Sequence, residues 1–126
     1  DVYKRQNQLP STEALSKAVD FSIQANVECT LINCSHADIA SNSIRELART
    51  PKFGIFANSS TFKEIDLSIS TKDIDAIHHL NSEIISAKEY AKIALNWAKE
   101  GAYVVGGCCG TTVEHTKQIK LLLETL

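Results

Sequence analysis

The sequence predicts an α/β fold in which parallel strands alternate with helices. Short apolar segments rich in β-branched residues alternate along the chain with longer segments of helical periodicity. Cysteines lie at the carboxyl ends of two of these short segments, where parallel α/β folds place their chemistry. The 126 residues are enough for one domain, and the apolar fraction of 44% is ordinary for a globular protein.

The first half of the chain predicts two helix–strand pairs. Residues 11–26 form a helix, because Ser11 and Thr12 can cap it and apolar residues follow at helical spacing. A buried strand is expected over 27–32. A second helix spans 38–49, and a short apolar strand follows over 53–57.

The second half predicts a long connection and then a helix, a strand and a last helix. Residues 58–85 are mixed, with a short helix over 73–80, and a connection of this length usually marks an active-site loop or an insertion. The next helix is expected over 86–99, stopped by Gly101, with Tyr90, Ala91, Ala94 and Trp97 packed on one face. The last strand and the last helix are expected over 102–105 and 112–126.

Three strands with four helices cannot close a barrel, and an open sheet leaves strand edges unpaired. The chain is therefore expected to be part of a larger domain. Residues 1–6 resemble the translation of a sequencing adapter. The alternative is that they are a frayed natural terminus. We take residues 7–126 as the domain portion.

Composition excludes several classes of function. The formal charge of −2 gives no reason to expect a nucleic-acid partner. The apolar runs are far shorter than a membrane span, and no secretory segment is evident. Four cysteines in this setting indicate a reducing, cytoplasmic location, where cysteines are ligands or nucleophiles more often than disulfides.

Three of the four cysteines form a candidate metal site. Cys108 and Cys109 lie between glycines at the end of an apolar run, and Cys34 ends an earlier one. Three thiolates at strand ends could hold a zinc ion and leave a fourth position open for a substrate. The alternatives are core cysteines or a vicinal disulfide for the pair, and a small apolar strand-end residue for Cys34. Cys29 is expected to be a core residue on the opposite face of the strand from Cys34.

The histidines have plainer interpretations than metal binding. His36 is expected to be a polar loop residue, with lining of the pocket beside Cys34 as the alternative. His78 and His79 are expected to be solvated in the long connection. His115 should lie in the first turn of the last helix, either supporting a ligand or at the surface.

The run from Gly106 to Thr112, followed by Glu114-His115, resembles the closing signature of the homocysteine S-methyltransferase family. Asn33-Cys34-Ser35 is similar to the family's other zinc-cysteine motif, and Asn58 matches an asparagine found after the middle strand. The resemblance runs from about Ser11 to the end, with departures at Ala57, Ser60 and Val113. It implies the C-terminal part of a (β/α)8 TIM barrel, about the last three βα units, incomplete as a barrel.

The resemblance also implies an activity. Cys34, Cys108 and Cys109 would hold Zn²⁺, and a methyl group would pass to the thiol of homocysteine to give methionine. The methyl donor would be a methyl-sulfonium, betaine or a methyl-corrinoid. Residues 7–126 by themselves, as part of a barrel, are expected to be inactive. Asn58 would orient the substrate or a ligand cysteine, or only form a turn. The alternatives are a structural zinc module with His36 as fourth ligand, and a thiol-redox protein that uses Cys108 and Cys109.

Overall fold

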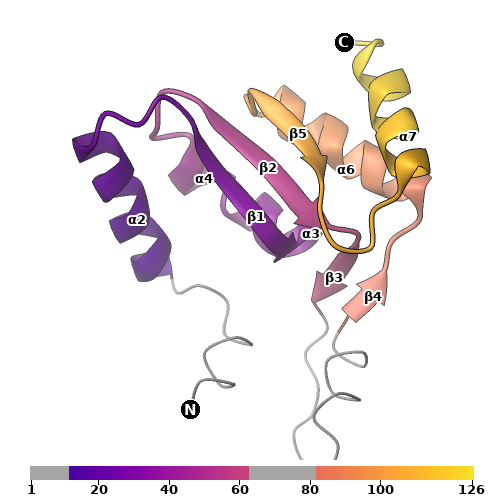
Figure 1. Ribbon diagram of the computed structural model, residues 1–126, viewed down its shortest axis with the longest axis horizontal. Coiled ribbons are helices and arrows are strands. Elements are labelled where there is room, and N and C mark those ends of the chain that lie inside the picture. Colours follow the sequence, from indigo (N-terminus) through magenta and orange to yellow (C-terminus); the bar gives the residue numbers. More distant parts are fainter. Residues whose placement is uncertain (1–11, 63–81) are drawn as a thin grey trace, which may run out of the picture.

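The computed structural model describes residues 12–62 and 82–126 (Figure 1). Three features expected from the sequence lie outside these residues: the adapter-like segment 1–6, the short helix over 73–80, and the solvated pair His78 and His79.

The described residues form an α/β fold with parallel βα units, as the sequence predicts. The main sheet has three parallel strands in the spatial order β1-β2-β5, and β2 pairs with both neighbours. Among the described residues the sheet is open, with β1 and β5 at its edges. The strands are β1 (Thr30–His36), β2 (Phe53–Asn58) and β5 (Val104–Gly107).

Within the described residues five helices accompany the sheet, and Figure 1 shows α3, α4 and α6 behind it, with α2 and α7 at either side. None of the helices in the described ranges is long and apolar enough to cross a membrane. The helices are α2 (Thr12–Gln24), α3 (Ala37–Asn42), α4 (Ile44–Leu47), α6 (Ala87–Lys99) and α7 (Val113–Leu123).

The core lies between α6 and one face of the sheet. Helix α6 begins with a capping box formed by Ser86 and Glu89, so its register is fixed at the start. The four residues predicted to face inward are all 1% exposed or less, which confirms the predicted apolar face: Tyr90, Ala91, Ala94 and Trp97. They pack in one cluster with the alternate β2 residues Phe53, Ile55 and Ala57.

The other face of the sheet lies away from this core. Strand pairing aligns Leu31, Gly54 and Val104 in one row, and Asn33, Phe56 and Gly106 in the next. Leu31 is 47% exposed although it is a large apolar residue of the sheet. Only one face of the sheet is therefore covered by the described helices.

Strand β1 starts and ends later than predicted. Thr30 is the first residue that pairs with β2, because β2 itself begins at Phe53. The predicted strand over 27–32 is therefore wrong at both ends. Cys29 precedes the strand and is partly exposed, so its expected position inside the strand and in the core is also wrong.

The single helix predicted over 38–49 is two short helices, α3 and α4. The hydroxyls of Ser41 and Ser43 donate to the carbonyls of Ala37 and Ile39, each at 2.8 Å. Serine hydroxyls that bond four residues back bend a helix. Ser43 then becomes the residue between α3 and α4.

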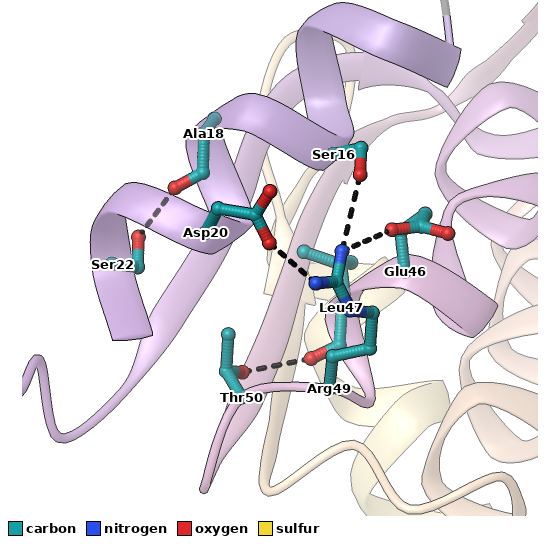
Figure 2. Close-up of polar contacts among 8 residues, drawn as sticks. All are labelled: Ser16, Ala18, Asp20, Ser22, Glu46, Leu47, Arg49 and Thr50. Carbon is teal, nitrogen blue, oxygen red and sulfur yellow. Dashed lines mark hydrogen bonds and ion pairs between the residues drawn. The ribbon is translucent and has the colours of Figure 1, made fainter. Parts of the chain in front are cut away.

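A polar cluster around Arg49 holds α2 against the turn after α4 (Figure 2). The Arg49 guanidinium donates to Asp20 and to Ser16 of α2, the latter at 3.1 Å, and to Glu46 of α4 at 2.8 Å. Hydrogen bonds to Glu46 and then to Asp20 raise the pKa of Arg49 above its usual value. The side chain is 41% exposed, so these ion pairs orient α2 more than they stabilise the fold.

The connection after β2 contains a small antiparallel pair that the sequence does not reveal. β3 (Ser60–Phe62) pairs with β4 (Ser82–Ile84). Three-residue strands carry too little alternation to be recognised from a pattern. Strand β5 also lies two residues later than predicted, because its ladder with β2 runs from Gly54 to Ala57.

Candidate metal centre

Cys34 sits on a distorted segment at the carboxyl end of β1. The register with β2 shifts between Asn33 and His36, so Cys34 lies in an irregularity of the ladder. Its φ is 59°, in the left-handed region that non-glycine residues rarely adopt. Strain of this kind persists where the surrounding contacts over-determine the conformation, and it concentrates at functional sites.

Cys108 and Cys109 lie on the loop between β5 and α7. The Cys108 amide donates to the Ala57 carbonyl at 2.8 Å, and the Ser59 amide donates to the Cys109 carbonyl at 3.0 Å. Gly110 then turns the chain with a φ of 76°. Of the glycines beside the two cysteines, Gly110 is the one with a positive φ. Gly106 and Gly107 belong to β5, where a side chain on Gly106 would collide with the Phe56 ring.

These two segments bring the three sulfur atoms together. Cys34 Sγ lies 2.9 Å from Cys108 Sγ and 3.5 Å from Cys109 Sγ, and the two neighbouring sulfurs are 4.0 Å apart. All three are free thiols. The sulfurs form a group in which all ligand atoms lie within 4.8 Å of one another, and no histidine or carboxylate of the described residues joins it.

Close contact between the thiols separates their pKa values. The hydrogen bond with Cys108, and then that with Cys109, raises the pKa of Cys34 to about 11. The hydrogen bond with Cys34 lowers the pKa of Cys108 below its usual value. The contact therefore favours the thiolate at Cys108 over the thiolate at Cys34.

Asn58, at the end of β2, links the two cysteine segments. Its Nδ2 donates to the Cys34 carbonyl at 3.2 Å, and its Oδ1 accepts from the Cys109 amide at 3.1 Å. Both ends of the amide are thus engaged with the backbone of a cysteine. These contacts fit the predicted role of orienting the cysteines, whereas a role toward a substrate stays a prediction.

Two histidines differ from expectation. His36 is the last residue of β1 rather than a loop residue, and its Nδ1 lies 2.8 Å from Ser60 Oγ. His115 is buried, with 8% of its surface exposed, so a surface position is wrong. Its Nδ1 accepts from the Thr112 amide at 3.1 Å, which closes the first turn of α7.

Two residues near the cysteines have roles that the sequence did not reveal. The Tyr90 hydroxyl lies 2.7 Å from the Ala57 carbonyl oxygen and 2.9 Å from that of Gly106. Burial raises the pKa of this hydroxyl above its usual value. Ser59 is buried and bonds through its backbone to both Cys109 and Ile85. Helical periodicity predicts the packing of Tyr90 but carries no information on its hydroxyl.

Comparison with known proteins agrees with this arrangement. The family model for homocysteine S-methyltransferase matches residues 2–123 of the 126-residue chain. The chain belongs to the homocysteine S-methyltransferase family. A search of curated proteins gave no significant match.

The cysteine group is suited to zinc, the metal that the family resemblance implies. Thiolates are ligands that Zn²⁺ prefers, at a Zn–S distance near 2.3 Å, which places sulfurs about 3.8 Å apart in a tetrahedron. Two of the observed separations, 3.5 and 4.0 Å, lie close to this value. The third, 2.9 Å between Cys34 and Cys108, has to widen by about 0.9 Å. The donor set and two of the three separations therefore fit a zinc ion, while the Cys34 and Cys108 sulfurs have to move apart.

Proposed function

We propose that this chain carries the zinc-binding part of an enzyme that transfers a methyl group to the thiol of homocysteine, giving methionine. The observation that carries the proposal is the convergence of Cys34, Cys108 and Cys109 at the carboxyl edge of a parallel sheet. That edge is where parallel α/β enzymes hold their reacting groups. The membership of the family supplies homocysteine as the acceptor.

The three-stranded sheet is proposed to be part of a (β/α)8 barrel. Its uncovered face, with the rows through Gly54 and Phe56, would then line the barrel interior. The two outer strands would pair with further strands, which removes unpaired sheet edges. Residues that grip the amino and carboxylate groups of homocysteine would come from those further parts.

The three cysteines would hold the zinc ion. When bound, zinc lowers the pKa of a substrate thiol and leaves the resulting thiolate nucleophilic, as expected of a site rich in thiolates. The homocysteine sulfur forms a bond to the methyl carbon while the bond from that carbon to the donor breaks, and the thiol proton is released. Asn58 bonds the backbone of both Cys34 and Cys109, and so keeps the two segments and their sulfurs close together.

One observation disfavours a purely structural zinc module. Such a site needs a fourth protein ligand. His36 is the nearest candidate in sequence, but it does not belong to the sulfur group, and its Nδ1 is engaged with Ser60. Among the described residues no fourth ligand joins the three sulfurs, and the proposal assigns that position to the substrate sulfur.

The test compares cysteine variants in the complete protein. Cys34→Ser and Cys109→Ser should each lower the zinc content well below one ion per chain and abolish formation of methionine. Cys29→Ser is the matched control, because Cys29 is a free cysteine outside the sulfur group. It should retain both zinc and activity.

The assay supplies homocysteine with a methyl-sulfonium, betaine or a methyl-corrinoid in separate reactions, which also identifies the donor. Full zinc content in Cys34→Ser would contradict the metal site. Full zinc content in the unmodified protein, with no methyl transfer from any of the three donors, would favour the structural module.

A further inference from the structure

Two aromatic side chains support the loop that carries Cys108 and Cys109, called here the cysteine loop (residues 108–112). Tyr90 of α6 is fully buried, and His115 lies in the first turn of α7 with 8% of its surface exposed. The two rings pack edge to face, with centroids 5.6 Å apart and an interplanar angle of 75°.

Tyr90 acts at the beginning of the cysteine loop. Its hydroxyl lies within hydrogen-bond distance of the carbonyls of Ala57 and Gly106, which belong to neighbouring strands. The Ala57 carbonyl also accepts the Cys108 amide at 2.8 Å. The Tyr90 hydroxyl and the Cys108 amide therefore share one acceptor, the Ala57 carbonyl.

His115 acts at the end of the cysteine loop. Its Nδ1 accepts from the Thr112 amide at 3.1 Å and lies 3.0 Å from Thr112 Oγ1. Because the amide donates, Nδ1 is the acceptor nitrogen, and the ring proton is on Nε2, which lies 3.5 Å from the Ile85 carbonyl oxygen. The position is the third of the helix, where glutamate or glutamine usually supplies this acceptor.

We propose that Tyr90 and His115 are positioning residues that together fix the two ends of the cysteine loop, and so set the spacing of the Cys108 and Cys109 sulfurs toward Cys34. The proposal rests on the proposed zinc-binding function. Packing alone does not require the polar atoms, because phenylalanine would fill nearly the same volume as Tyr90 without burying a hydroxyl. Outer groups that orient metal ligands in this way typically contribute 10–100-fold to metal affinity.

The structure offers a matched control on the same helix. Trp97 of α6 is as buried as Tyr90, and its Nε1 donates to Ser41 Oγ at 2.7 Å. This bond ties α6 to α3 and does not touch the cysteine loop. Ser41→Ala therefore removes this partly buried hydrogen bond of α6, together with the bond from Ser41 to the Ala37 carbonyl, without altering the support of the loop.

The experiment measures Co²⁺ affinity by chelator competition, the thiolate-to-cobalt absorption band and the thermal midpoint of the complete protein. Tyr90→Phe and His115→Leu should each weaken Co²⁺ binding by roughly 10–100-fold and change the absorption band. His115→Gln restores an acceptor and should stay within about 3-fold of the unmodified affinity. Ser41→Ala should lower the midpoint and leave the affinity unchanged.

The outcomes separate this inference from the proposed function. If Tyr90→Phe and His115→Leu lower the midpoint but keep the unmodified affinity and absorption band, the two residues are only structural and the inference fails. If Tyr90→Phe does not fold, the Co²⁺ affinities of His115→Leu and His115→Gln decide the inference. Equal affinities of these two variants would contradict it. If the unmodified protein binds Co²⁺ no better than Cys34→Ser does, the proposed zinc site fails and the inference fails with it.

Discussion

The two segments that supply the sulfurs reach the same point by different means. Cys34 itself takes a left-handed backbone conformation at an irregular end of β1. In the cysteine loop neither cysteine has a positive φ, and the left-handed turn falls on Gly110. Both segments are held by contacts from other parts of the chain, but only the cysteine loop places the left-handed turn on a glycine, which favours it. The comparison indicates that the left-handed residue of the first segment depends on tertiary contacts, whereas the left-handed turn of the second is favoured by its own residue, Gly110.

The largest expected difference between the two segments is in thiol chemistry. After zinc is removed with a chelator, iodoacetamide should modify Cys108 before Cys34, because thiolates are the reactive species. The pKa of Cys34 is raised from 9.0 to about 11, which leaves roughly 100-fold less thiolate near pH 8. The pKa of Cys108 is lowered, so its thiolate forms at a lower pH than that of an ordinary thiol.

Peptide mass spectrometry over a range of pH measures this order. Modification of Cys34 should rise only as the pH approaches 11. In urea, where the contacts between the segments are lost, the two cysteines should react at similar rates. Preferential reaction of Cys34 in the folded protein would show that the proton is assigned to the wrong sulfur.

Asn58 tests whether the two segments depend on each other. Asn58→Ala removes the bond to the Cys34 carbonyl and the bond from the Cys109 amide together. Zinc affinity should fall by roughly 10–100-fold, since the segments lose their shared partner. Asn58→Asp keeps an acceptor for Cys109 but no donor for Cys34, so its affinity should be intermediate. Equal affinities in all three proteins would mean that the segments are positioned independently.

Gly110 tests the local character of the cysteine loop. Gly110→Ala places a Cβ at a φ of 76° and 2.5 Å from Ser59 Oγ. The left-handed conformation alone should cost about 1–2 kcal/mol of stability. Urea unfolding measures the loss, and Gly101→Ala is the control, because its φ is also positive but its nearest neighbour is 3.8 Å away. A smaller loss at Gly110 than at Gly101 would contradict the tight packing of the loop on Ser59.

The smallest expected effect concerns one hydrogen bond inside the cysteine loop. The Thr111 hydroxyl donates to the Cys108 carbonyl at 2.7 Å, while the Thr111 amide also bonds this carbonyl. Thr111→Val should therefore cost only about 1 kcal/mol in urea unfolding and leave zinc content unchanged. Loss of zinc in this variant would show that the loop relies on this hydroxyl more than on Gly110 and the strand bonds.

Local sequence determined most of the architecture. The spacing of Tyr90, Ala91, Ala94 and Trp97 predicts the buried face of α6, because a helix repeats its surface every 3.6 residues. Cysteines placed at the carboxyl ends of strands predict one shared edge, because parallel strands present those ends together. The three sulfurs do converge there. The sequence alone could thus indicate which residues meet, and the family model agrees with the chemistry.

Only the tertiary structure decided how those residues are held. Strand β1 starts at Thr30 because its partner starts at Phe53, and no pattern within residues 27–36 contains that partner. The Asn58 amide and the Tyr90 hydroxyl both contact residues far away in the chain. The left-handed conformation of Cys34 lies where the pairing of β1 with β2 becomes irregular. Periodicity reports which face of an element is apolar, whereas the partner of a polar atom depends on what the folded chain brings beside it.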